Sequence, residues 1–126
     1  MINKIESPNA PKALGPYSQA VKAGNLVFLS GQLGLDPQGG ELKHGAFEQA
    51  RQALINLENI LKAGGCKMAD AVRCDIFLTN IDDFADVNAA YEQFFTSDPK
   101  PARQTVAVSA LPKNALVEIS LIAATN

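Results

Sequence analysis

The sequence predicts a single α+β domain over residues 1–126, with strands and helices in the order ββ-α-β-α-ββ. Three observations lead to this prediction. Apolar residues switch from strand-like alternation to a helical repeat and back along the chain. Glycine and proline stand at the switches, where turns are expected. The chain has 126 residues and is 47% hydrophobic, which suits one globular domain.

A hairpin opens the predicted fold. The segments Ser18–Ala23 and Leu26–Gln32 flank Gly24 and Asn25, two residue types that tolerate the positive φ of a tight turn. A second turn is expected at 36–40, where the sequence is Asp-Pro-Gln-Gly-Gly.

Two amphipathic helices follow. Apolar residues recur at steps of three and four from Phe47 to Leu61, and a pair of glycines at 64 and 65 ends this pattern. After a predicted cap at Asn80, the same spacing runs from Phe84 to Phe94, and prolines 99 and 101 lie beyond it.

The remaining strands are predicted at Ala71–Thr79, between the helices, and at Gln104–Ala110 and Leu116–Ala124, after them. The last two are expected to form a hairpin that folds about residues 110–115. The final strand is apolar on both faces, which calls for cover on both. Since two helices can cover only one face of the sheet, the sequence predicts a homo-oligomer.

Composition excludes several classes of function. The 11 Lys and Arg residues against 13 Asp and Glu residues give a formal charge of −2, so there is no electrostatic footprint for nucleic acid or an anionic membrane. The apolar runs are too short to span a bilayer, and the first residues lack the apolar core of a signal peptide. We therefore expect a cytoplasmic protein. Cys66, Cys74 and His44 are too few ligands for a structural zinc site.

Two charged residues stand out because they lie in apolar strands. Glu118 interrupts the run 116–122, where a carboxylate needs a cation, a donor, water or a proton. Arg103 stands at the beginning of the preceding strand, so the predicted hairpin would place it near Glu118, within one chain or across a subunit boundary. On the sequence alone, a purely structural ion pair is the alternative interpretation.

Three further polar residues are candidates for a pocket. Tyr17 lies in a rigid turn before the first strand and either presents its hydroxyl to a pocket or packs in a core or interface. Ser30 ends a strand and either donates to a ligand or bonds to local backbone. Asn88 lies beside the apolar stripe of the second helix and either meets a ligand or is a solvated or capping residue. A Cys–His nucleophile pair would require His44, which lies in a polar turn.

Several of these segments together resemble the RidA (YjgF) family of reactive-intermediate imine deaminases, nearly end to end over residues 2–124. The matching segments are Gly15-Pro16-Tyr17-Ser18-Gln19-Ala20, Leu29-Ser30-Gly31-Gln32, Asp86-Val87-Asn88-Ala89-Ala90-Tyr91, Pro101-Ala102-Arg103 and Val117-Glu118-Ile119. The resemblance implies a chorismate-mutase-like two-layer sandwich and a homotrimer with a central β-barrel, whose active sites lie between subunits.

The resemblance also implies a chemistry. Members of the family hydrolyse enamines and 2-imino acids, such as 2-aminoacrylate, 2-iminobutanoate and 2-iminopropanoate, to 2-oxo acids and ammonia. These substrates are released by pyridoxal-phosphate dehydratases of amino-acid metabolism, and the family uses no metal or organic cofactor. By the match of motifs, Arg103 binds the substrate carboxylate and Glu118 activates water. The other residues implied to line the cleft are Tyr17, Ser30, Gly31, Asn88 and Thr105.

The sequence departs from the family pattern at two positions. Thr105 stands where most members carry a cysteine, and Gln104 is larger than the usual residue. The backbone amide of that cysteine is the feature usually linked to binding, so we expect hydrolysis to survive. Two alternatives stay open: a non-catalytic regulatory module that binds a small carboxylate, and RNA cleavage, which nothing basic or aromatic in the chain supports.

Overall fold

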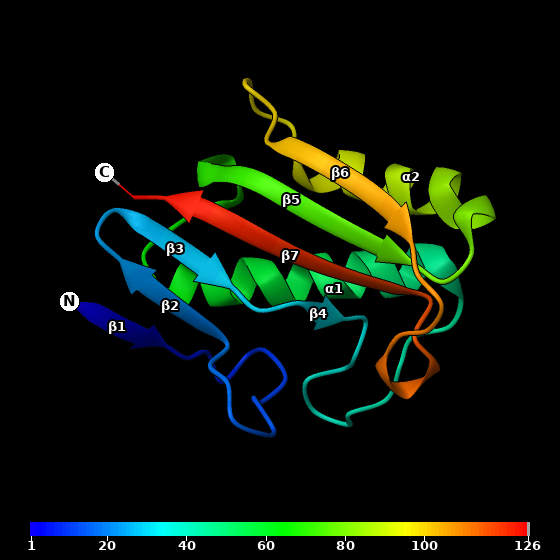
Figure 1. Ribbon diagram of the computed structural model, residues 1–126, viewed down its shortest axis with the longest axis horizontal. Coiled ribbons are helices and arrows are strands. Elements are labelled where there is room, and N and C mark those ends of the chain that lie inside the picture. Colours follow the sequence, from blue (N-terminus) through cyan, green and yellow to red (C-terminus); the bar gives the residue numbers. More distant parts are fainter. Residues whose placement is uncertain (126) are drawn as a thin grey trace.

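The computed structural model describes residues 1–125. Over that range the strands are β1 (Ile2–Ile5), β2 (Ala20–Ala23), β3 (Leu26–Leu29), β4 (Gln32–Leu33), β5 (Ala71–Leu78), β6 (Ala102–Ala107) and β7 (Val117–Ala124), and the α-helices are α1 (Gly45–Ala63) and α2 (Phe84–Phe94). The strands form one sheet in the order β1-β2-β3-β7-β5-β6, and β4 also pairs with β7. Both helices lie behind the sheet in Figure 1.

This α+β arrangement confirms the predicted class and the order of its main elements. Two short strands, β1 and β4, were not predicted. With four residues and two residues, they are too short to show a clear alternation of apolar and polar side chains. The predicted strands at 104–110 and 116–124 are observed at Ala102–Ala107 and Val117–Ala124.

The predicted turns and helix ends are confirmed, except that Asn80 caps a short 3₁₀ turn and not α2 itself. Gly24 adopts a positive φ of 62° in the β2–β3 turn, and Gly65 does so, at 78°, just beyond α1. Asn80 caps the short 3₁₀ turn Ile81–Asp83 that leads into α2, and its side chain accepts a hydrogen bond from the Asp82 N–H at 2.9 Å.

The predicted hairpin of the last two strands is wrong. The strand β5 lies between them, parallel to β6 and antiparallel to β7. The cause is the connection through α2, since a helical crossover returns the chain parallel to the strand it left. As a result β6 lies at one edge of the sheet and β7 lies near its middle (Figure 1).

The core fills the space between the helices and one face of the sheet. Its fully buried side chains include Leu54, Leu57, Ile60 and Leu61 of α1, Val87 of α2, Ile76 and Leu78 of β5, and Val117, Ile119 and Leu121 of β7. No helix in residues 1–125 combines the length and apolarity that crossing a bilayer requires.

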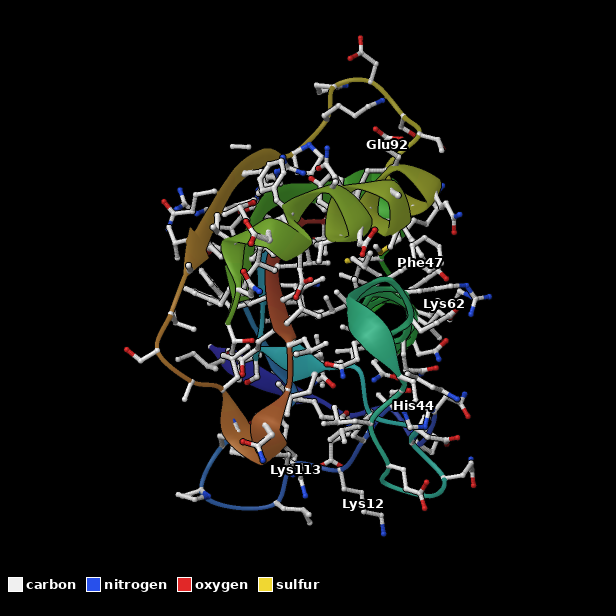
Figure 2. The ribbon with its side chains drawn as sticks, turned by 90° about the vertical axis from the view of Figure 1, so that its right-hand side faces the viewer. Lys12, His44, Phe47, Lys62, Glu92 and Lys113 are labelled. Atoms are coloured by element: carbon white, nitrogen blue, oxygen red, sulfur yellow. The ribbon has the colours of Figure 1, made fainter. Side chains whose placement is uncertain are left out.

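The opposite face of the sheet has no such cover in this chain. Figure 2 shows α1 and α2 together on one side of the strands. On the other side, Phe28 of β3 and Val106 of β6 are each 40% exposed. Phe77 of β5 and Ile122 of β7 are half-buried on the same open face. The expected uncovered apolar face is therefore present.

Candidate active site

The carboxylate of Glu118 lies on the open face of the sheet. Glu118 pairs with Phe77 of β5 on one side and with Leu33 of β4 on the other. Its neighbours in the strand, Val117 and Ile119, are fully buried on the helix side. The alternation of side chains along β7 therefore turns Glu118 away from the core.

Gly31 lies directly against this carboxylate. A Cβ atom at position 31 would be 2.5 Å from Glu118 Oε2 and 2.8 Å from its Cδ. Only a residue without a side chain allows this approach. Burial raises the pKa of Glu118 above its ordinary value of 4.5 because the charged form loses hydration. A carboxyl group in this setting suits proton transfer better than a fully solvated one.

Glu118 opens into a cavity of about 460 Å³, which we call the Glu118 cavity. Three more of the predicted residues line it, namely Tyr17, Ser30 and Gly31. The other walls are mainly apolar, with Leu14, Leu33 and Leu35 among them, and two lysines join them. These lysines, Lys12 and Lys113, lie at the same end of the molecule in Figure 2.

The two hydroxyl-bearing residues that line this cavity, Ser30 and Tyr17, differ in their contacts within the chain. Ser30 Oγ donates to the Ser18 carbonyl oxygen at 2.6 Å, so the predicted local backbone partner is present. Its oxygen keeps acceptor capacity for a ligand. Tyr17 is 53% exposed and does not pack in the core. Its turn begins at Gly15, whose φ of 134° favours glycine.

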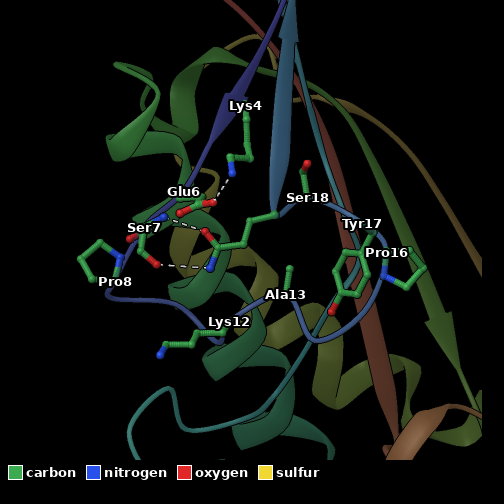
Figure 3. Close-up of a pocket in the computed structure, with 10 residues that line it drawn as sticks. Lys4, Glu6, Ser7, Pro8, Lys12, Ala13, Pro16, Tyr17 and Ser18 are labelled. Carbon is green, nitrogen blue, oxygen red and sulfur yellow. Dashed lines mark hydrogen bonds and ion pairs between the residues drawn. The ribbon is translucent and has the colours of Figure 1, made fainter.

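The segment that carries Tyr17 is firmly anchored. The side chain of Gln19 accepts from the Ser7 N–H at 2.6 Å and donates to the carbonyl oxygens of Ser7 and Pro11 at 3.2 and 2.8 Å. Figure 3 shows Ser7 with its two hydrogen bonds beside a second cavity, of about 730 Å³. Tyr17 and Lys12 line both cavities, so the anchored segment forms the wall between them.

A second cluster surrounds Arg103 at the edge of the sheet, and we call it the Arg103 cluster. Arg103 Nη1 donates to Asn88 Oδ1 of α2 at 2.5 Å. The guanidinium carbon lies 4.7 Å from the centre of the Tyr91 ring and 5.6 Å from that of Phe84. These contacts hold the guanidinium plane by one hydrogen bond and two cation–π interactions, and the remaining N–H groups stay available.

Two predicted residues accompany Arg103. Asn88 binds the arginine itself, which makes it a positioning residue in this chain. Thr105 lies two residues farther along β6 on the same face as Arg103. Its Oγ1 is buried and has no hydrogen-bond partner among residues 1–125.

Within one chain, the structure does not bring Arg103 and Glu118 together. Arg103 pairs with Cys74, which faces the helices, whereas Glu118 pairs with Phe77 on the open face. Arg103 and Glu118 lie on strands that are separated by β5, so the two strands are about 10 Å apart across the sheet. The two side chains also project from opposite faces of the sheet. The predicted contact within one chain is therefore wrong, and contact across a subunit boundary is the remaining form of that prediction.

The cysteines form no nucleophile pair with His44. Both thiols are free and buried. Burial raises the pKa of Cys74 to about 12, which keeps its thiol protonated and unreactive. Cys66 lies just beyond the C-terminal end of α1, whereas His44 lies at the N-terminal end. Among residues 1–125, no group of three or more His, Cys, Asp or Glu side chains could hold a metal ion.

Sequence reasoning missed Phe84, Tyr91, Lys12 and Lys113 as neighbours of the candidate site. The first two had a usable signal, because with Asn88 they occupy one stripe of α2 at spacings of four and three residues. Their apolar character assigned them to the core instead. The lysines had no comparable signal, since only the folding of two distant loops brings them to one cavity.

The fold and these two clusters define the kind of protein by three features: a sheet with one uncovered face, an exposed arginine held by an amide and two aromatic rings, and a partly buried carboxyl group in a cavity. The sequence matches the endoribonuclease L-PSP family over residues 7–125. The chain belongs to this family, which includes the RidA (YjgF) proteins.

Individual relatives agree with that assignment. The chain is 44% identical over 125 residues to a 2-iminobutanoate/2-iminopropanoate deaminase of Escherichia coli K12, with 98% of each chain covered. It resembles the crystal structure of RidA from the Antarctic bacterium Psychrobacter, with 44% identity, a TM-score of 0.93 and coverage of 97% and 98%. It also resembles Escherichia coli TdcF with bound serine, with 40% identity, a TM-score of 0.93 and coverage of 98% and 99%.

Proposed function

We propose that this protein is a 2-iminobutanoate/2-iminopropanoate deaminase, which hydrolyses short 2-imino acids and their enamines to 2-oxo acids and ammonia. The observation that carries the proposal is the near-complete match to deaminases of that name, at 44% to 48% identity. The Arg103 cluster and the Glu118 cavity supply the two functions that this reaction needs, namely an anion site and a proton acceptor.

The active site is formed between two chains of a homotrimer. Arg103 and Glu118 leave opposite faces of one sheet, so a site that uses both must take them from different chains. The open face, with Phe28 and Val106, offers the apolar surface for such an association. Three chains packed by these faces enclose a central β-barrel, and closed symmetry of this kind gives three equivalent sites.

Arg103 binds the carboxylate of the imino acid. A guanidinium group presents two parallel N–H donors that match the two oxygens of a carboxylate. Asn88 Oδ1 occupies one Nη1 hydrogen, and the rings of Phe84 and Tyr91 restrict the plane of the group. The fork is therefore ordered before the substrate arrives, which lowers the entropic cost of binding.

Glu118 acts on water at the imine carbon. Its carboxylate takes a proton from water as the oxygen bonds to C2 of the iminium group, and a tetrahedral amino alcohol forms. The protonated Glu118 then gives its proton to the nitrogen, and the C–N bond breaks as the Glu118 carboxylate takes the proton of the new hydroxyl group, so that C2 becomes a carbonyl. The departing ammonia carries this last proton away as ammonium, which restores the Glu118 carboxylate. The iminium carbon is itself electrophilic, so orientation and proton transfer suffice and no metal or organic cofactor is needed.

The remaining residues shape the cleft. Tyr17, Ser30 and Gly31 line the cavity that holds Glu118, and the backbone near Thr105 lies beside Arg103. The substrates are released by pyridoxal-phosphate dehydratases that act on serine and threonine, so the protein serves amino-acid metabolism in the cytoplasm.

The test follows the product of a threonine dehydratase. The protein is added to the dehydratase and threonine, and the rate of 2-oxobutanoate formation from the released imine is measured. We expect acceleration by the wild type. For Arg103→Ala we expect a loss of kcat/KM of about tenfold to a hundredfold, the usual size for a charge-assisted hydrogen-bonding group. Arg51→Ala, on the exposed side of α1, is the matched control and should behave as the wild type.

Three outcomes would contradict the proposal. Acceleration that is unchanged in Arg103→Ala would remove the anion site from the mechanism. Saturable binding of 2-oxobutanoate without acceleration would instead indicate a non-catalytic carboxylate-binding module. RNA cleavage that disappears in both Arg103→Ala and Glu118→Ala would indicate a nuclease.

A further inference from the structure

Two amide side chains are buried on the face of α1 that packs against the sheet. Gln49 is 5% exposed and Asn56 is fully buried, and both lie among alanine and leucine side chains. They are seven residues apart, so they lie two turns apart on the same helix face. A buried amide destabilises the fold unless its polar atoms are paired, so the partners of these two side chains are informative.

Asn56 anchors β4 to α1. Its Nδ2 donates to the carbonyl oxygens of Leu33 at 3.3 Å and of Leu35 at 3.0 Å. The side chain is itself oriented by Gln52, whose Nε2 donates to Asn56 Oδ1 at 2.9 Å. β4 is two residues long and pairs only with β7 among the described strands. The bonds from Asn56 therefore tie the main chain at the end of this short strand, and just beyond it, to α1.

Gln49 anchors the segment that enters β7. Its Oε1 accepts from the Leu116 N–H at 2.8 Å, and its Nε2 donates to the Lys43 carbonyl oxygen at 3.0 Å. Leu116 directly precedes β7 and is two residues before Glu118. Gly34, just after β4, packs so closely on the main chain of Gln49 that a Cβ atom there would overlap it.

The two anchors meet at one point of the candidate site. Leu33, held by Asn56, is the register partner of Glu118. Gly31, two residues before Leu33, forms the wall against which the Glu118 carboxylate lies. Asn56 thus fixes the wall and Gln49 fixes the strand that bears the carboxylate. In Figure 1, α1 lies behind both β4 and β7, so one rigid helix sets both segments.

We propose that Gln49 and Asn56 are positioning residues that set the Glu118 carboxylate against the Gly31 wall of its cavity. The inference rests on the proposed function, because it assigns them to the reaction of Glu118. It differs from a merely structural role in one measurable respect. In the proposed site the substrate carboxylate binds at the Arg103 of a neighbouring chain and not at Glu118, so a displaced Glu118 lowers kcat and leaves KM nearly unchanged.

The test is the steady-state kinetics of Asn56→Leu and Gln49→Met with the imine as substrate. Each substitution replaces the amide by an apolar side chain of similar length and removes the hydrogen bonds. We expect kcat to fall at least about tenfold, because a misplacement of about 1 Å can cost a hundredfold. KM should stay within about twofold of the wild type.

A second readout is the acid limb of the rate profile. In these variants the wall of the Glu118 cavity is held less firmly, so water reaches the carboxylate and lowers its raised pKa. The acid limb should therefore move to lower pH. Neither substitution replaces the other titratable residues that line the cavity, which are Tyr17, Lys12 and Lys113.

Asn59→Leu is the matched control. Asn59 lies on the same helix and also donates to a loop carbonyl, that of Asn9 at 3.0 Å, which belongs to neither β4 nor β7. It should keep wild-type kcat and the wild-type rate profile. Should Asn56→Leu fail to fold, Gln49→Met decides by the same criteria.

Folded variants with wild-type kcat and rate profile would overturn the inference, even with a lower Tm. A wild type that does not accelerate imine hydrolysis would overturn both this inference and the proposed function.

Discussion

Glu118 combines a functional position with a cost to stability. Burial raises its pKa, so the folded chain favours the protonated carboxyl group. The stabilisation from this group is full below the ordinary pKa of 4.5 and is lost as pH rises through the raised value. Glu118→Gln stays neutral at every pH. We therefore expect its Tm to exceed that of the wild type at pH 7, with a smaller difference at pH 4, and its imine turnover to be lost at both.

Thermal unfolding at the two pH values, with the deamination assay alongside, checks this prediction. A variant less stable than the wild type at pH 7, or one that still turns over imine, would contradict it. The same carboxylate should place the acid limb of kcat/KM above pH 4.5, because the base must be ionised in the free enzyme.

Gly31 is required for a close approach and not for a special φ. Its added Cβ would overlap Glu118 Oε2. Gly31→Ala should therefore displace the carboxylate and lower kcat by about a hundredfold at little cost to stability. The matched control is Gly39→Ala, since nothing lies within 4 Å of a Cβ there. Equal turnover by the two variants would show that the contact at Gly31 has no role in the reaction.

At the scale of elements, local periodicity accounts for what was predictable. The apolar stripes of α1 and α2, the alternation in β5 and the glycines after α1 are local signals, and the structure follows them. The order of strands depends on non-local pairing. Nothing near Arg103 or Glu118 in the sequence indicates that β5 separates β6 from β7, so the hairpin prediction was wrong.

The edge strand β6 carries an unusual polar group. Thr105 Oγ1 is buried and unpaired within residues 1–125. Thr105→Val keeps the shape and removes this hydroxyl, so we expect a gain of about 1 kcal/mol in the free energy of unfolding. Activity should be retained, because the proposed contact at this position is made by the backbone.

Denaturant unfolding at equal protein concentration, together with kcat/KM, measures both effects of Thr105→Val. Thr105→Cys, which restores the common family residue, is the control for volume and polarity. A tenfold loss of kcat/KM in Thr105→Val would show instead that the hydroxyl itself contacts the substrate.

At the scale of the whole molecule, the placement of Arg103 and Glu118 on opposite faces predicts complementation between inactive variants. In a mixed trimer of Arg103→Ala and Glu118→Gln chains, one boundary receives a native Arg103 from one chain and a native Glu118 from its neighbour. After random reassembly of equal amounts, about a quarter of the wild-type rate should return.

The measurement is the deamination rate of the two variants before and after joint refolding. Each variant refolded alone is the control and should keep its own low rate. Failure to recover activity from reassembled mixed trimers would show that the two residues do not share a site across a boundary.

The sequence by itself determined the α+β class, both helices, the uncovered apolar face and the family, along with the residues on which the candidate site depends. Helix stripes and turn residues are set by neighbours along the chain, and short motifs are read without knowing where they lie in space. Only the tertiary structure decided that Arg103 and Glu118 leave opposite faces, that Asn88 binds the arginine and that Gln49 and Asn56 hold β4 and β7. Those relations depend on which strand lies beside which, and that order follows from packing over the whole chain.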